Sequence, residues 1–114
     1  MKRGEVWTAS GGPDYAGTPR PVVIVQDDAF QTASVAVCAL TTFPVDAPMV
    51  RLPVDPTPGN GLRQASWIMV DKVATMPRSK MGSLVGRLEQ DAMERLDDAL
   101  MVFVGLARPS QVNP

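Results

Sequence analysis

The pattern of apolar and polar positions divides the chain into a long strand-rich part and a shorter helical part. Residues 5–9 alternate between polar and apolar side chains, which is typical of a strand with one buried face. Residues 20–26 and 34–40 are largely apolar runs, and such runs are typical of strands buried on both faces. Residues 49–54 indicate an edge strand. Further short strands are expected at residues 66–71, 73–76 and 84–86, which makes five to seven strands in all.

The period changes at Leu88, where a helical pattern begins. Apolar residues recur at the i, i+3, i+4 and i+7 spacing of an amphipathic helix: Ala92, Met93, Leu96, Ala99, Leu100, Phe103 and Val104. Strands followed by one helix predict a mainly β fold, a small, curled antiparallel sheet or barrel with a C-terminal helix packed on it. We expect residues 1–108 to form a single domain and residues 109–114 a short flexible tail.

Composition excludes several classes of chemistry. The chain has 114 residues, of which 45% are hydrophobic and 20% charged, as expected for one globular domain. No apolar run approaches the ~20 residues that a membrane span needs, so we expect no membrane segment. Its single cysteine, Cys38, cannot form an internal disulfide and is expected in the core. With no histidine, the chain cannot use Ser-His-Asp or Cys-His catalysis. We expect no metal site and no cofactor.

Charge is distributed unevenly along the chain. The net charge is −1, from 11 basic and 12 acidic residues. Residues 89–98 hold five carboxylates against one arginine, so this stretch carries −4 and the rest of the chain +3. We expect the acidic stretch to be a solvated helix face. The basic remainder is able to bind an anionic ligand.

Arg20 is the most informative charged residue. It lies between Pro19 and Pro21, which fix the backbone at the start of an apolar strand. A guanidinium held in this way suits phosphate oxygens. The alternative is an edge arginine that pairs with a carboxylate, for which three residues are candidates: Asp27, Asp28 and Asp71.

Thr41 closes the strand that follows the Arg20 strand. If these two strands pair as an antiparallel hairpin, Arg20 and Thr41 lie at the same end of the sheet. The long loop that carries Asp14 reaches the same end. A guanidinium, a hydroxyl and a carboxylate are therefore expected to converge there.

Several segments resemble one protein family. Residues 2–7, Lys-Arg-Gly-Glu-Val-Trp, are similar to the Arg-Gly-Glu-Ile-Trp opening of MazF/PemK-type toxins of bacterial toxin–antitoxin systems. Residues 16–28 are similar to that family's Ala-Gly-x-Arg-Pro-Val-Val-Val-Gln-Asn-Asp signature. Three later segments match in order, at residues 40–42, 70–73 and 84–88, so that the resemblance covers roughly residues 2–106.

The resemblance implies both a fold and an activity. The fold is an SH3-like barrel of the CcdB/MazF kind with a C-terminal helix. The activity is that of a cytoplasmic, homodimeric mRNA interferase, a metal-independent endoribonuclease that cuts single-stranded RNA and is neutralised by a cognate antitoxin protein.

Matching the motifs residue by residue implies roles at the site. The family's catalytic arginine falls on Arg20, its catalytic threonine on Thr41 and the acidic residue of its first loop on Asp14. Contacts with RNA are expected from five more residues: Tyr15, Thr42, Trp67, Asp71 and Lys72. Tyr15 and Trp67 are able to stack on bases, although such aromatic residues more often pack inside the protein.

The chain departs from the family pattern at three positions. Pro19 is inserted before the Arg-Pro pair, Ala74 stands where many members of the family have arginine, and Met69 stands where some members have one. These changes put the secondary basic contacts in doubt and, with them, the cleavage preference.

The absence of histidine favours attack by the substrate's own 2′-hydroxyl on the adjacent phosphate. The expected products carry 2′,3′-cyclic phosphate and 5′-hydroxyl ends. Arg20 would stabilise the phosphorane charge and Thr41 would donate a second hydrogen bond. Asp14 is the candidate base, although an ordinary aspartate, with a pKa near ~3.9, is a weak one.

Two alternatives remain open. One is a CcdB-type gyrase poison of the same fold, whose C-terminal Trp-Gly-Ile has no counterpart in residues 107–110, Ala-Arg-Pro-Ser. The other is a catalytically degenerate, SH3-like binding module.

Overall fold

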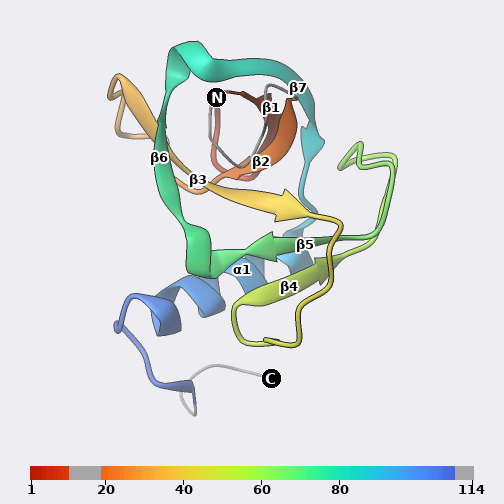
Figure 1. Cartoon of the computed structure of the whole chain (residues 1–114). Coiled ribbons are helices and arrows are strands. Elements are labelled where there is room, and N and C mark those ends of the chain that lie inside the picture. The colour runs from red at the N-terminus through yellow and green to blue at the C-terminus, as the bar shows by residue number, and fades with distance from the viewer. Residues whose placement is uncertain (11–18, 110–114) are drawn as a thin grey trace.

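A computed structural model of the chain describes residues 1–10 and 19–109. It contains seven strands and one α-helix (Figure 1). The elements are β1 (Glu5–Ala9), β2 (Arg20–Ile24), β3 (Ser34–Thr41), β4 (Arg51–Val54), β5 (Ser66–Met69), β6 (Ala74–Pro77), β7 (Met81–Arg87) and α1 (Gln90–Phe103). The predicted mainly β fold with a C-terminal helix is confirmed.

Several strand boundaries differ by one to three residues from the sequence-based expectation, and two of them lie near residues discussed below. The strand predicted over residues 66–71 ends at Met69, because the chain turns into a short 3₁₀ helix, Val70–Lys72. The last strand begins at Met81, earlier than the predicted residue 84. Gly82 and Ser83 give no apolar signal, yet their backbone belongs to β7, which pairs with β1 through two register shifts.

The strands form one strongly curled antiparallel sheet. Its order is β4-β5-β3-β2-β1-β7, and β6 pairs separately with β3. β3 is the centre of the fold because it pairs with β2, β5 and β6. Within the described part of the chain, β4 and β7 stand at the two ends of this order, so the barrel is curled but not closed by strand pairing. Figure 1 shows the chain from β6 to β7 arching around the N-terminal end.

Two apolar clusters pack on opposite faces of β2 and β3. Val23 and Cys38 belong to the cluster that α1 covers with Leu96. Val22 and Val37 belong to a second cluster on the other face, together with partly buried methionines. The double-sided burial of β2 is the arrangement that its continuous apolar run predicts.

α1 packs one face on the sheet and exposes part of the other. Ala92, Leu96 and Ala99 are its buried residues. The expectation of a fully solvated acidic face is only partly correct. The Asp97 carboxylate lies 2.8 Å from the Arg3 guanidinium. At the helix start, Glu89 accepts a 2.7 Å hydrogen bond from the Thr57 hydroxyl.

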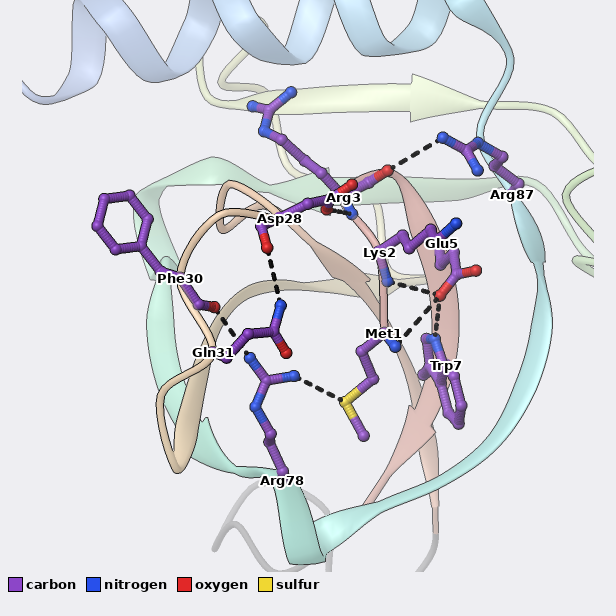
Figure 2. Close-up of polar contacts among 10 residues, drawn as sticks. All are labelled: Met1, Lys2, Arg3, Glu5, Trp7, Asp28, Phe30, Gln31, Arg78 and Arg87. Carbon is purple, nitrogen blue, oxygen red and sulfur yellow. Dashed lines mark hydrogen bonds and ion pairs between the residues drawn. The ribbon is translucent and has the colours of Figure 1, made fainter.

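Arg78 contacts both the N-terminal residue and the loop between β2 and β3, and so connects these segments at one end of the curled sheet (Figure 2). The Arg78 guanidinium donates to the carbonyls of Phe30 and Thr32 and approaches the Met1 sulfur. Because Arg78 begins the 3₁₀ turn between β6 and β7, these contacts fix that turn against the β2–β3 loop. Among the described residues, no helix is both long and apolar enough to cross a membrane.

Candidate active site

A cavity of about 530 Å³ opens beside the second apolar cluster, between β6 and the ends of β1, β2 and β3. Its polar lining consists of Ser10, Arg20, Thr41, Lys72, Thr75 and Lys80. Three of these side chains are cations, and no carboxylate is among the described residues that line the space. We call it the cationic cavity.

The register of β2 and β3 brings the two predicted catalytic residues together. Val22 pairs with Ala39 and Ile24 with Val37 in this antiparallel ladder. The same register continued to the strand ends places Arg20 opposite Thr41, and both residues line the cationic cavity. The prediction that they lie at one end of the sheet is therefore confirmed.

Within the part of the chain that the structure describes, no side chain competes with a ligand for Arg20. Its side chain is exposed and has no ion pair or hydrogen bond with any described residue. The alternative of an arginine paired with Asp27, Asp28 or Asp71 is wrong. Asp27 accepts from the Ala29 amide, Asp28 accepts from the Arg3 amide, and Asp71 binds a different arginine.

The Thr41 hydroxyl is oriented by the loop that follows it. Its oxygen accepts a 3.1 Å hydrogen bond from the backbone amide of Phe43. A hydroxyl that accepts in this way still has its own proton to donate. Thr41 is thus able to donate a hydrogen bond to an anionic ligand beside Arg20.

Asp71 has a structural partner. The Arg51 guanidinium contacts both of its carboxylate oxygens, with Nε–Oδ1 at 2.7 Å and Nη2–Oδ2 at 3.1 Å. The hydrogen bond from Arg51 is the main cause that lowers the pKa of Asp71. The pair fixes the turn Val70–Lys72 and thereby the position of Lys72.

The structure places the other predicted site residues in three groups. Lys72 lines the cationic cavity. Thr42, Trp67 and Asp71 are not among its lining residues, although Trp67 pairs with Thr41 across the β3–β5 ladder. Asp14 and Tyr15 lie outside the described residues.

Sequence reasoning missed three polar residues of the cavity: Ser10, Thr75 and Lys80. Lys80 follows a Pro-Arg-Ser segment that looks like an ordinary turn, and only the pairing of β7 with β1 brings it to the site. Met69 and Ala74, the two positions at which the family resemblance leads one to expect arginine, both line the cavity. Because their side chains are apolar, the positive charge of the described cavity lining comes from Arg20, Lys72 and Lys80.

The described part of the chain offers neither a cluster of metal ligands nor a reactive cysteine. No three Cys, Asp or Glu side chains there gather closely enough to hold a metal ion. Burial raises the pKa of the Cys38 thiol to about 12, which removes its nucleophilic form at neutral pH. The prediction that Cys38 is a core residue is confirmed.

Comparison with known proteins identifies the family of the chain. The model of the PemK-like, MazF-like toxins of type II toxin–antitoxin systems matches residues 2–104. A protein of Mycolicibacterium smegmatis named probable endoribonuclease MazF is 50% identical over 108 residues, which is 94% of this chain and 99% of the relative.

Solved structures show the same fold. An endoribonuclease in complex with its cognate antitoxin, from a mycobacterial species, superposes with a TM-score of 0.78 at 25% identity, over 96% of this chain and 99% of that one. The toxin MazF-mt6 of Mycobacterium tuberculosis gives 0.76 at 26% identity, over 90% and 98%. With the family model matching nearly the whole chain, this protein belongs to the PemK-like, MazF-like toxins of type II toxin–antitoxin systems.

Proposed function

We propose that the protein is a cytoplasmic toxin of a toxin–antitoxin system and a metal-independent endoribonuclease that cuts single-stranded mRNA. One observation carries this proposal: Arg20 and Thr41 face each other in a cavity whose described lining holds three cations and no carboxylate. Such a space attracts a polyanion, and its two opposed donors suit one phosphate group. The cytoplasmic location follows from the proposed substrate.

The proposed reaction is an internal transfer at phosphorus. The 2′-oxygen forms a bond to the adjacent phosphorus, the bond from phosphorus to the 5′-oxygen breaks, and the 2′-hydroxyl proton passes to a base. A proton is delivered to the departing 5′-oxygen. Because the nucleophile is already tethered, alignment removes much of the barrier. Arg20 and Thr41 bind the phosphorane oxygens as charge develops on them.

Asp14 is the proposed base. The described lining of the cationic cavity offers no carboxylate, so the base must come from another part of the chain, from the RNA or from water. Asp14 belongs to the segment that joins Ser10 to Pro19, and both of these residues lie at the cavity end of the sheet.

The proposed protein partners are a cognate antitoxin and a second copy of the chain. The mycobacterial structure cited above contains an endoribonuclease bound to its antitoxin. An acidic, disordered antitoxin segment would compete with RNA for the cationic cavity, because both are polyanions. The end of α1 and the residues after it carry exposed apolar side chains that suit protein association: Met101, Phe103, Val104 and Leu106.

Incubation with a long unstructured RNA in EDTA tests the proposal. We expect cleavage that yields 2′,3′-cyclic phosphate and 5′-hydroxyl ends, identified by end-labelling and mass spectrometry. Arg20→Ala should lower the rate by about a hundredfold or more, as removal of one preorganised donor does. Its fold should persist because the Arg20 side chain is exposed and has no described partner.

Arg63→Ala is the matched control, because Arg63 is exposed and does not line the cationic cavity. Intact RNA with the wild-type protein, or full activity in Arg20→Ala, would overturn the proposal. A gyrase assay in parallel would detect the CcdB-type alternative.

A further inference from the structure

We infer that Lys80 and Ser10 bind the phosphate next to the scissile one, on the side of the Arg20–Thr41 centre opposite to Lys72. The site then holds at least three consecutive phosphates with the reacting one in the middle. This inference rests on the proposed ribonuclease function and specifies its substrate as RNA extended on both sides of the cleaved bond.

Strand pairing places Lys80 at a defined position relative to Arg20. Ala9 of β1 pairs with Arg20 of β2 on one side and with Met81 of β7 on the other. The amide of the next residue, Ser10, donates a 3.2 Å hydrogen bond to the Lys80 carbonyl. Neighbouring strands lie about 4.8 Å apart, so Ser10 is one strand from Arg20 and Lys80 is two strands away, about 10 Å along the sheet.

Lys72 lies on the other side of the catalytic centre. It directly precedes Val73 and β6, whereas Lys80 ends the 3₁₀ turn that follows β6. β6 runs along the cationic cavity, and the two lysines stand at its opposite ends. In the order of strands in the sheet, Thr41 on β3 and Arg20 on β2 lie between β6, which Lys72 precedes and which pairs with β3, and β7, which Lys80 precedes.

The wall between the lysines is suited to bases rather than phosphates. Ala74, Met76 and Pro77 of β6 contribute apolar surface to the cavity between Lys72 and Lys80. A single-stranded RNA can place its bases on such a surface while its phosphates follow the cations. The apolar wall and the row of cations therefore match the two chemically different sides of one RNA strand.

The Lys80 side chain is available, and its backbone is firmly held. Its ammonium group is exposed and has no ion pair with a described residue. The turn Arg78–Lys80 is anchored by the Arg78 amide, which donates to the Ala33 carbonyl, and by the Arg78 guanidinium. A lysine whose backbone is already fixed loses less conformational entropy on binding a phosphate than a lysine in a mobile loop does.

Neutral phosphate substitution tests the inference. The cleavage site is first mapped with the wild-type protein, and a short RNA around it is made uncleavable by a 2′-deoxy nucleotide at the reacting position. Methylphosphonate linkages, which carry no charge, then replace the flanking phosphates one at a time. The dissociation constant of each RNA is measured with the wild type, Lys80→Ala and Ser10→Ala.

We expect one flanking position where the neutral linkage weakens wild-type binding by about tenfold, the usual scale for a hydrogen bond to a charged group. Lys80→Ala should weaken binding of the all-phosphate RNA by a similar factor, and the neutral linkage should weaken its binding much less than that of the wild type, because only the Ser10 contact with that phosphate remains. Its salt dependence, as the slope of log K against log salt, should be smaller by about 0.7, the value for one phosphate of a single strand. Ser10→Ala should be less sensitive to the same linkage than the wild type.

Lys80→Met, which keeps the aliphatic stem, serves as a second variant if Lys80→Ala does not fold. Lys2→Ala is the control, because Lys2 is exposed and lies outside the cationic cavity. The inference is wrong, while the proposed function stands, if the wild type cuts RNA but each methylphosphonate linkage raises the dissociation constant by the same factor in the wild type and in the Lys80 variant. If the wild type cuts no RNA, the proposed function itself fails.

Discussion

Arg51 and Asp71 form a bidentate ion pair next in sequence to Lys72, which lines the cationic cavity, and their closest atoms are 2.7 Å apart. Arg51 begins β4, and Asp71 lies in the turn after β5, so the pair closes the β4–β5 hairpin at the end that carries Lys72. The carboxylate that the family resemblance assigns to RNA binding is therefore occupied by the protein itself. We expect Asp71 to act on RNA through the position of Lys72.

The Arg51–Asp71 pair should give a pH-dependent stability difference. Arg51→Met should lower the free energy of unfolding at pH 7 by about 0.5–1 kcal/mol, since both side chains are partly solvated. The pKa of Asp71 is depressed in the folded protein, so its stabilisation is present above the unfolded pKa near ~3.9 and is lost as pH falls through the folded value. Urea unfolding at pH 7 and pH 3 measures this. An equal difference between variant and wild type at both pH values would contradict the assignment.

Two substitutions at Thr41 distinguish a catalytic role of its hydroxyl group from a role of its side chain in packing. Thr41→Val keeps the shape but removes the donor, and it should lower kcat by about ten- to a hundredfold with a smaller change in KM. Thr41→Ser keeps the oxygen that accepts from the Phe43 amide and should retain most of the activity. Steady-state cleavage of a short fluorescent RNA provides both constants. Equal activity in Thr41→Val and Thr41→Ser would remove the hydroxyl from the mechanism.

Cys38 should be inert and dispensable for activity. Its side chain is fully buried and its thiol pKa is raised to about 12, so a disulfide reagent at pH 8 should react only after unfolding. Cys38→Ala should cost about 1–2 kcal/mol through lost core packing and leave RNA cleavage unchanged. Thiol titration with and without urea, followed by an activity assay, checks both statements. Rapid labelling of the folded protein would show that the β3 core opens.

Gly61 and Gly105 both have a positive φ, so replacing each by alanine distinguishes the cost of a steric clash from the cost of backbone strain alone. A methyl group on Gly61 would collide with the Val85 carbonyl oxygen, whereas one on Gly105 would meet no atom of the described residues within 4 Å. Gly105→Ala should cost only the strain of a left-handed alanine, about 1 kcal/mol. Gly61→Ala should cost clearly more, because the loop must also move away from β7. Thermal unfolding of the two variants compares them directly, and equal melting temperatures would rule out the close approach.

The sequence predicts the elements of the fold well but only the centre of the site. The continuous apolar run of β2 and the helical period of α1 are local signals, so residues such as Val23 and Leu96 identify their elements directly. Arg20 and Thr41 were found because two consecutive strands usually form a hairpin. Lys80 was missed because it reaches the cationic cavity only through the pairing of the last strand with the first, a contact between distant parts of the chain. The ion pair of Asp71 could not be predicted from the sequence because its partner, Arg51, belongs to another strand and nothing local links them.

The placement of α1 has a consequence for how the protein meets its substrate. The helix carries most of the acidic stretch and covers one face of β2 and β3, while the cationic cavity opens beside the other face. A nearly neutral molecule with charges separated in this way has a large electric dipole. In the field of an RNA strand it would rotate so that the cavity turns toward the strand before the two touch, and this steering weakens as ionic strength rises. Salt should therefore slow the association rate as well as weaken the complex, although the net charge of the chain is only −1.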